Sequence, residues 1–174
     1  MRLDIQKTTA PLGADGVTPP IKLRGMRGMI AAKMLQSLQQ SAQLTHHASA
    51  RLDALQALRQ RRRDDELPVP SLQDLLLRLI VQTLGDFPAL NATLEENCIT
   101  RHAAVHLGLA IPLPDDLLVA PALFDAQTLR LGELPEARRE LTEEARSGQL
   151  GVKALTGATF TVSNLGRSRV QHFT

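Results

Sequence analysis

The stretch from residue 71 to residue 84 constrains the fold more than any other part of the sequence. It opens with S-L-Q-D, which resembles a helix capping box in which Asp74 takes the place of the usual Glu or Gln. Pro68 and Pro70 interrupt the chain just before it. Apolar residues then recur at helical spacing on a wide face, which predicts a central, buried helix that ends near Phe87. They are Leu72, Leu75, Leu76, Leu79, Ile80 and Leu84.

Length and composition indicate one domain with an aliphatic core. The chain has 174 residues, of which 43% are hydrophobic and 22% are charged, as in ordinary globular proteins. Aromatic residues make up 2%, without Trp or Tyr, so the core must consist mainly of Leu, Ala and Val. The net charge of +2 is too small to indicate a polyanionic partner by itself.

Cysteine content and the first residues bear on location. Cys98 is the only cysteine, so no disulfide can form within the chain and a reducing compartment is expected. The opening M-R-L-D-I-Q-K-T-T-A contains no apolar run long enough for a signal peptide or a membrane span. We therefore expect a cytoplasmic protein. Residues 1–20 mix Gly, Pro and small residues and are expected to form a disordered tail or the remnant of a linker.

Two helices and a strand are predicted before the central helix. Residues 26–41 carry apolar side chains at helical spacing, and residues 43–52 alternate as in a strand. Asp53 could cap a second helix that turns its leucines inward and Arg59–Arg63 outward. The apolar residues are Met26, Met29, Ile30, Met34 and Leu38 in the first helix and Leu52, Leu55 and Leu58 in the second.

Strands dominate the part after the central helix. Residues 91–100 predict a hairpin that turns at 95–97, and a second hairpin should pair Val105–Pro112 with Leu117–Pro121 across Pro114, Asp115 and Asp116. A last helix should contain Pro135 in its first turn and stop at Gly148. Its markers are Leu131, Leu134, Leu141 and Ala145. Because helices and strands interleave, the expected class is α/β or α+β with a mixed sheet.

Several eye-catching residues give no clear site. Arg59–Arg63 are followed at once by acidic residues and have no interleaved aromatic, which favours a solvated helix end over nucleic-acid binding. His46 and His47 would point to opposite faces of a strand. H-A-A-V-H, from His102 to His106, lacks the Glu of the zinc-protease helix, so no metal site is expected. Cys98 is expected to be a packing residue.

A strand-like run, Thr159–Val162, delivers Ser163 and Asn164 into a glycine-containing turn. F-T-V-S-N-L-G lacks the G-x-S-x-G pattern of a nucleophilic serine. A serine at the end of a strand is usually structural, and spacing alone does not assign a function to it.

Several blocks together resemble the catalytic domain of the dihydrolipoamide acyltransferases, the E2 components of 2-oxo acid dehydrogenase complexes. The blocks are I-K-L-R-G-M-R-G-M-I-A-A-K-M, L-T-H-H-A-S-A-R-L-D-A-L, F-P-A-L-N-A-T-L, H-L-G-L-A-I-P-L-P-D-D-L-L-V-A-P, A-R-S-G-Q-L and F-T-V-S-N-L-G. The resemblance implies a chloramphenicol acetyltransferase-like α/β (α+β) fold, a two-layer sandwich with a mixed sheet. Residues 21–174 would form its N-terminal two thirds, so the fold is expected to be incomplete.

The family chemistry gives Ser163 a role. These enzymes move an acyl group between the thiols of dihydrolipoamide and coenzyme A, with the His of an H-x-x-x-D-G motif as general base. The Ser of F-T-[IV]-S, which matches Ser163, stabilises the oxyanion. Arg27 matches a family arginine that would pair with the Asp of H-x-x-x-D-G, and Asn164 is a further candidate. Coenzyme A would be a substrate, the lipoyl group would be carried by another domain or protein, and no metal is implied.

The sequence departs from the family in one respect that matters for activity. No histidine is followed by x-x-x-D-G, and His172 lies close to Ser163 in sequence rather than opposite it. We therefore expect a C-terminally truncated acyltransferase domain, inactive or nearly so alone. In the family, Ser and His come from different subunits of a trimer. Expected partners are thus a homotrimer or larger E2-like core and other components of the complex, with no nucleic acid and no membrane.

Two other functions stay open at this point. The chain could be a non-catalytic interaction module that co-assembles with full-length E2 subunits, or, as a third hypothesis, Arg59–Arg63 could bind nucleic acid. The acyl group is open as well, because acetyl, succinyl and branched-chain enzymes share these blocks.

Overall fold

The computed structural model describes residues 22–114, 117–166 and 170 of the chain. The expected tail, residues 1–20, lies outside the described residues. The chain divides into two compact units, residues 1–43 and 44–174. The first contains helix α1, Gly25–Gln40, which confirms the predicted first helix. Of its apolar residues, Met29, Met34 and Leu38 are exposed.

The predicted strand at residues 43–52 is wrong. No strand is assigned there, and residues 42–51 are exposed. A strand is stable only when a neighbour accepts and donates its backbone hydrogen bonds. No described strand pairs with this segment, so its alternating pattern has no sheet to join.

Helix α2, Asp53–Asp64, forms where it was predicted, but its start and its basic side differ from expectation. Leu52 is the N-cap and Asp53 makes no cap hydrogen bond; its carboxylate instead pairs with Arg51, Nε to Oδ2 at 2.7 Å. Arg59 and Arg62 do not simply point outward. Their Nε atoms donate to Pro70 O at 3.0 Å and Pro68 O at 2.7 Å, so they hold the following loop against α2.

Helix α3, Leu72–Asp86, begins with the predicted capping box: Asp74 N–H donates to Ser71 Oγ, and the Asp74 carboxylate accepts from Ser71 N–H. The predicted apolar face is partly wrong. Leu77 and Val81 are buried, whereas Leu76 and Leu79 are 37% and 44% exposed. The buried stripe runs at i, i+4 and i+7 from Leu77. The predicted face shares Leu84 with it, and the predicted Leu75 is buried as well.

The first hairpin is confirmed. The 3₁₀ turn η1, Pro88–Leu90, leads into β1, Ala92–Glu95, which pairs antiparallel with β2, Cys98–Arg101. Glu96 and Asn97 in its two-residue turn have φ of 46° and 65°, the left-handed values of a type I′ turn. Cys98 is exposed, so its prediction as a packing residue is wrong; every residue of β2 is exposed.

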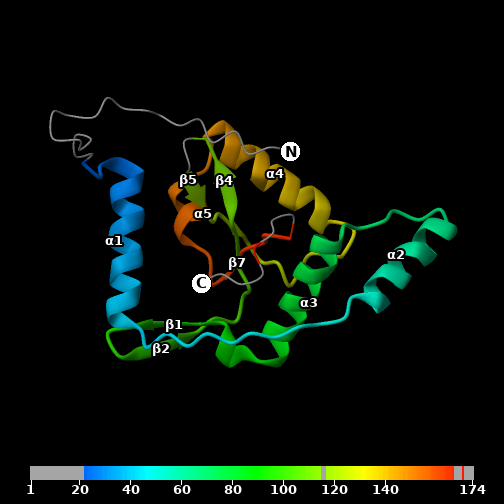
Figure 1. The fold of residues 1–174 in the computed structure, drawn as a ribbon, viewed down its shortest axis with the longest axis horizontal. Coiled ribbons are helices and arrows are strands. Elements are labelled where there is room, and N and C mark those ends of the chain that lie inside the picture. The colour runs from blue at the N-terminus through cyan, green and yellow to red at the C-terminus, as the bar shows by residue number, and fades with distance from the viewer. Residues whose placement is uncertain (1–21, 115–116, 167–169, 171–174) are drawn as a thin grey trace. The chain divides into compact units, whose positions relative to one another are not determined.

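The expected mixed sheet is present and has the order β6-β3-β7; its strand β7 is labelled in Figure 1. β3, Leu107–Leu109, pairs antiparallel with β6, Ala122–Leu123, and parallel with β7, Phe160–Val162. The predicted second hairpin forms only next to its turn, where β4, Ile111–Leu113, pairs with β5, Leu117–Val119, in a separate two-stranded sheet. The chain therefore changes sheets at Ala110. Turn residues 115–116 lie outside the described residues.

Two helices complete the second unit. α4, Leu134–Ser147, has Pro135 in its first turn and ends at Gly148 with φ of 71°, as predicted; a short helix, α5, Val152–Thr156, follows. One core cluster joins α3, β3 and α4 with the partly buried side chains of β7. Its fully or nearly buried members are Leu77, Val81, Leu84, Val105, Leu107, Leu109, Leu123, Ala126, Leu134 and Leu141. None of the helices among the described residues is long and apolar enough to cross a membrane.

Candidate functional site

Ser163 lies directly after β7, at the carboxyl end of the parallel pair β3–β7. The register aligns Leu107 with Phe160 and Leu109 with Val162, and Ala110 N–H extends the pairing by donating to Val162 O at 3.1 Å. Phe160 and Val162 pack against the core, whereas residues 161 and 163 are exposed. Because side chains alternate along a strand, Ser163 continues the outward face of β7.

Gly108 makes the close approach of β7 possible. A Cβ atom at this position would lie 2.9 Å from Ala158 Cβ and 3.0 Å from Thr161 Oγ1. Real Cβ atoms do not tolerate such contacts with packed neighbours. The glycine of H-L-G-L-A-I therefore fixes how closely β7, and with it Ser163, can lie against β3.

The turn after β7 is formed by the neighbour of Ser163. Asn164 Oδ1 accepts a hydrogen bond from Gly166 N–H at 2.8 Å, which is an Asx-type turn. Asn164 thus shapes the chain after Ser163. Among the residues that the structure describes, none forms a hydrogen bond with the Ser163 hydroxyl; the residue is exposed and directly follows β7. This geometry suits a donor to an oxygen atom of a bound molecule.

The two histidines of H-A-A-V-H have other contacts. His102 Nε2 lies 3.1 Å from Thr93 Oγ1 beside the first hairpin. His106 stands before β3, next to the start of β7, and its Nδ1 accepts from Asp125 N–H at 3.0 Å. Three residues of strand, about 10 Å, separate this end of β7 from Ser163. His106 is therefore not placed as a base for that hydroxyl. His172 lies outside the described residues.

The remaining site candidate, Arg27, lies on α1 in the first unit. Its pairing with an aspartate stays a prediction. Within residues 22–114 and 117–166, no group of three or more His, Cys, Asp or Glu side chains is arranged to hold a metal ion.

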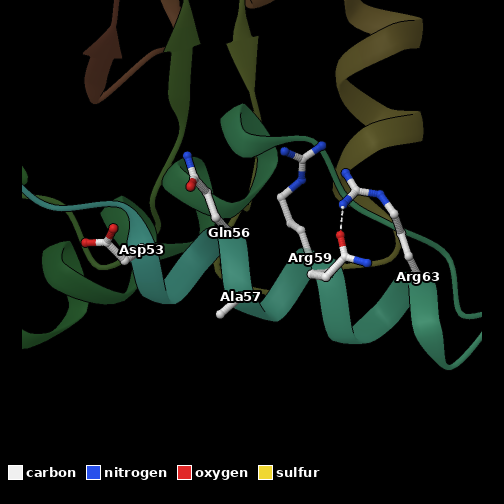
Figure 2. Close-up of a pocket in the computed structure, with 6 residues that line it drawn as sticks. Asp53, Gln56, Ala57, Arg59 and Arg63 are labelled. Atoms are coloured by element: carbon white, nitrogen blue, oxygen red, sulfur yellow. Dashed lines mark hydrogen bonds between the residues drawn. The ribbon is translucent and has the colours of Figure 1, made fainter.

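A depression of about 530 Å³ lies along α2, and neither Ser163 nor Asn164 lines it. Figure 2 shows Gln56, Arg59 and Arg63 projecting from the same side of this helix. Arg63 Nη1 donates to Gln60 Oε1 at 3.0 Å, and Arg59 binds a carbonyl of the following loop. These hydrogen bonds within the chain favour a structural role for the arginine run over nucleic-acid binding.

The description of the family model that matches residues 17–174 is "2-oxoacid dehydrogenases acyltransferase (catalytic domain)". The chain belongs to this family. The match covers all the blocks that suggested the resemblance, including H-L-G-L-A-I and F-T-V-S-N-L-G. Ser163, with the hydroxyl geometry described above, therefore stands in an acyltransferase catalytic domain.

Curated relatives come from several kinds of complex. Over 98% of its length the acyltransferase domain is 34% identical to the acetyltransferase component of an acetoin cleaving system from Bacillus subtilis. It is 30% identical over 93% to a succinyltransferase component of the 2-oxoglutarate dehydrogenase complex from Cupriavidus necator. It is 31% identical over 90% to a lipoamide acyltransferase component from Pseudomonas putida. The chain spans only 46%, 41% and 40% of these relatives.

Solved structures confirm the predicted fold. A dihydrolipoamide acetyltransferase from Azotobacter vinelandii superposes with a TM-score of 0.75 and 27% identity, covering 87% of this chain and 64% of that one. Its study concerned the role of a serine, a histidine and an asparagine in catalysis. A truncated catalytic core from Thermoplasma acidophilum has the same TM-score at 21% identity. The match covers 86% of this chain and 70% of the Thermoplasma chain, and it supports the fold alone.

Proposed function

We propose that this domain takes part in acyl transfer between dihydrolipoamide and coenzyme A, with Ser163 as the oxyanion donor. The observation that carries the proposal is the exposed Ser163 hydroxyl at the end of β7, in a chain that matches an acyltransferase family. The relatives act in acetyl, succinyl and branched-chain systems. The test must therefore compare these three kinds of acyl group.

The chemistry needs a base and an oxyanion donor. A free thiol has a pKa near 8.5 and is mostly protonated at neutral pH, so a base must take its proton while the sulfur attacks the thioester carbonyl. The carbonyl oxygen then carries the negative charge, and Ser163 Oγ–H donates to it. Collapse of the intermediate expels the other sulfur as a thiolate, which receives from the base the proton that the attacking thiol lost. Ser163 is never acylated in this scheme.

H-x-x-x-D-G does not occur in the 174 residues, so in this proposal the base is supplied from outside them. We propose that the domain joins a core of acyltransferase subunits, as suggested by neighbours that are cores of multienzyme complexes. A neighbouring subunit would supply the histidine, and Arg27 would pair with the aspartate of the same motif. Alone, the chain would be inactive or nearly so.

A complementation assay tests this proposal. The partner is a full-length acyltransferase of the family in which the serine of its own F-T-[IV]-S is replaced by alanine, while its histidine is intact. After co-expression and co-purification, transfer to dihydrolipoamide is measured from acetyl-, succinyl- and branched-chain acyl-coenzyme A. We expect the wild-type chain to restore turnover and Ser163→Ala to give about 10²–10³-fold less, the usual effect of removing one oxyanion donor.

Ser147→Ala is the matched control, because Ser147 is an exposed serine at the end of α4 and should restore turnover fully. Equal rescue by Ser163→Ala would contradict the role of the hydroxyl. Turnover by the isolated chain would contradict the external base. Co-purification without any turnover would favour the alternative function, a non-catalytic interaction module within an acyltransferase core.

A further inference from the structure

We infer that His106 is a positioning residue for Ser163: its neutral imidazole holds together the segments that fix the start of β7, and protonation loosens them. The link to catalysis rests on the proposed function, whereas the effect on β7 does not. His106 is half-buried and precedes β3.

The backbone of His106 sets where β7 begins. Its N–H donates to Thr159 Oγ1 at 3.0 Å, and its carbonyl oxygen accepts from Thr159 N–H at 2.8 Å and from Phe160 N–H at 3.3 Å. These contacts start the β3–β7 pairing, and the register of the pair then carries on to Val162. A shift of His106 therefore shifts the strand that ends at Ser163.

The imidazole connects this junction to the turn after β6. Nδ1 accepts from Asp125 N–H at 3.0 Å, so the ring is neutral at this atom and its single proton is on Nε2. The ring also meets Phe124 edge-on, with centroids 4.9 Å apart and planes at 68°. Asp125 has φ of 49°, an unusual value for a residue other than glycine, so the turn depends on contacts such as this hydrogen bond.

Phe124 packs against the backbone just before β7. A Cβ atom at Gly157 would lie 2.8 Å from Phe124 Cε1, so the ring packs directly on the backbone two residues before Thr159. Movement of the turn would press on this backbone or open a gap beside it. Imidazole, turn and strand entry are thus in continuous contact, over segments that are far apart in sequence.

Protonation changes what the ring can do. A proton on Nδ1 turns the acceptor into a donor, and Asp125 N–H then loses its partner. Two charged groups face the ring and its neighbour: the Asp125 carboxylate, with Oδ1 3.9 Å from Nδ1, and the Lys153 ammonium, 5.0 Å from the Phe124 ring centroid. Oδ1 of Asp125 already lies within ion-pair distance of Nδ1, so protonation would replace the hydrogen bond from Asp125 N–H by attraction to the carboxylate of the same residue. Histidine is the side chain that commonly changes charge between pH 8 and pH 5.

Hydrogen exchange on the full chain tests the inference without any assay of activity. Exchange of the peptide 158–165 is measured at pH 8 and pH 5.5 and corrected for the intrinsic effect of pH. We expect the wild type to lose protection by about two- to tenfold at the lower pH, the equivalent of one hydrogen bond. His106→Asn places an amide oxygen near the position of Nδ1 and cannot be protonated there, so its protection should not depend on pH. His106→Leu has no acceptor for Asp125 N–H, so the peptide 158–165 should be poorly protected at both pH values.

The same variants in the complementation assay connect the effect to Ser163. The kcat of wild type should fall at pH 5.5 relative to His106→Asn, with KM nearly unchanged, because His106 contacts the start of β7 and Ser163 follows its other end. Equal pH dependence of exchange in wild type and His106→Asn would overturn the inference, as would wild-type protection in His106→Leu. Failure of complementation by every variant, with the expected exchange pattern, would refute the proposed function and leave the effect of His106 on β7 supported.

Discussion

Replacing Arg138 by methionine should destabilise the protein by about 3 kcal/mol, because the Asp74 carboxylate would stay buried without its cation. Asp74 is 1% exposed, and Arg138 Nε donates to its Oδ1 at 2.7 Å. Loss of one partner of a buried pair costs about 3–5 kcal/mol. The lower value applies here since the Arg138 side chain is 26% exposed and Ser71 Oγ–H still donates to the carboxylate. The pair joins α3 to α4, so the whole unit should be affected.

Urea unfolding at pH 7 measures the effect, and two variants make it specific. The double variant Asp74→Asn/Arg138→Met should be less destabilised than Arg138→Met, because no unpaired charge is left in the interior. Arg139→Met should cost less than about 0.5 kcal/mol, since Arg139 and its partner Glu136 are a surface pair. For a chain of this length, about 3 kcal/mol corresponds to a fall in Tm of about 6–12 °C.

The pH dependence has a definite sign. Burial by itself raises the pKa of Asp74, but hydrogen bonds from Arg138 and Ser71 and the charge of Arg138 outweigh it, and the folded-state pKa is below 3.8. A lowered carboxyl pKa means that the unfolded state binds more protons. The contribution of ionised Asp74 to the free energy of unfolding is therefore complete above pH 3.8, and it disappears as the pH falls below 3.8 through the folded-state pKa. The stability difference between wild type and Asp74→Asn should shrink over this window. Equal urea midpoints for Arg138→Met and wild type at pH 7 would refute the reasoning.

Two further predictions concern packing. Gly108→Ala should destabilise by about 1–3 kcal/mol, because the added methyl forces apart β3 and β7, whereas Gly132→Ala, with nothing within 4 Å of its Cβ position, should stay within about 0.5 kcal/mol of wild type; equal midpoints in urea would contradict the close approach. Leu77→Ala should cost about 2–5 kcal/mol as a truncation in the core, and Leu79→Ala, on the exposed side of α3, should cost much less; a reversed order would restore the helix face predicted from sequence.

Features that depend on neighbours within a few residues could be predicted from the sequence. The capping box at Ser71 needs only the residue three positions later. Asn97 in the hairpin turn and Gly148 at the stop of α4 are residue types that adopt positive φ. In each case the local conformation is set by sterics and hydrogen bonds that the segment itself supplies.

Features that depend on partners could not be predicted. The segment 43–52 has the alternation of a strand, but no described strand pairs with it. The buried face of α3 is chosen by the position of α4, whose Arg138 binds Asp74 across 64 residues of sequence. Cys98 is exposed because both faces of β2 are exposed. Spacing within a segment says nothing about which neighbour will cover it.

The candidate site combines both kinds of information. That Ser163 ends a strand could be predicted from F-T-V-S-N-L-G, whereas its role as an oxyanion donor came from the family resemblance. Its position depends on Gly108 and on the contacts of His106 with Thr159, which are 53 residues apart. No local pattern reports such a contact, and neither Gly108 nor His106 was predicted to belong to the serine site.

Thr159→Val separates the two contacts of His106, the backbone hydrogen bond with Thr159 and the imidazole hydrogen bond with Asp125 N–H. Valine keeps the shape of threonine but has no oxygen to accept from His106 N–H, so protection of the peptide 158–165 against hydrogen exchange should fall at pH 8 as well as at pH 5.5. The contact between the imidazole and Asp125 N–H is untouched, so the further loss on going to the lower pH should remain. If Thr159→Val also abolished the pH dependence, the backbone junction and the imidazole would act as one contact, and protonation could not be assigned to the bond with Asp125.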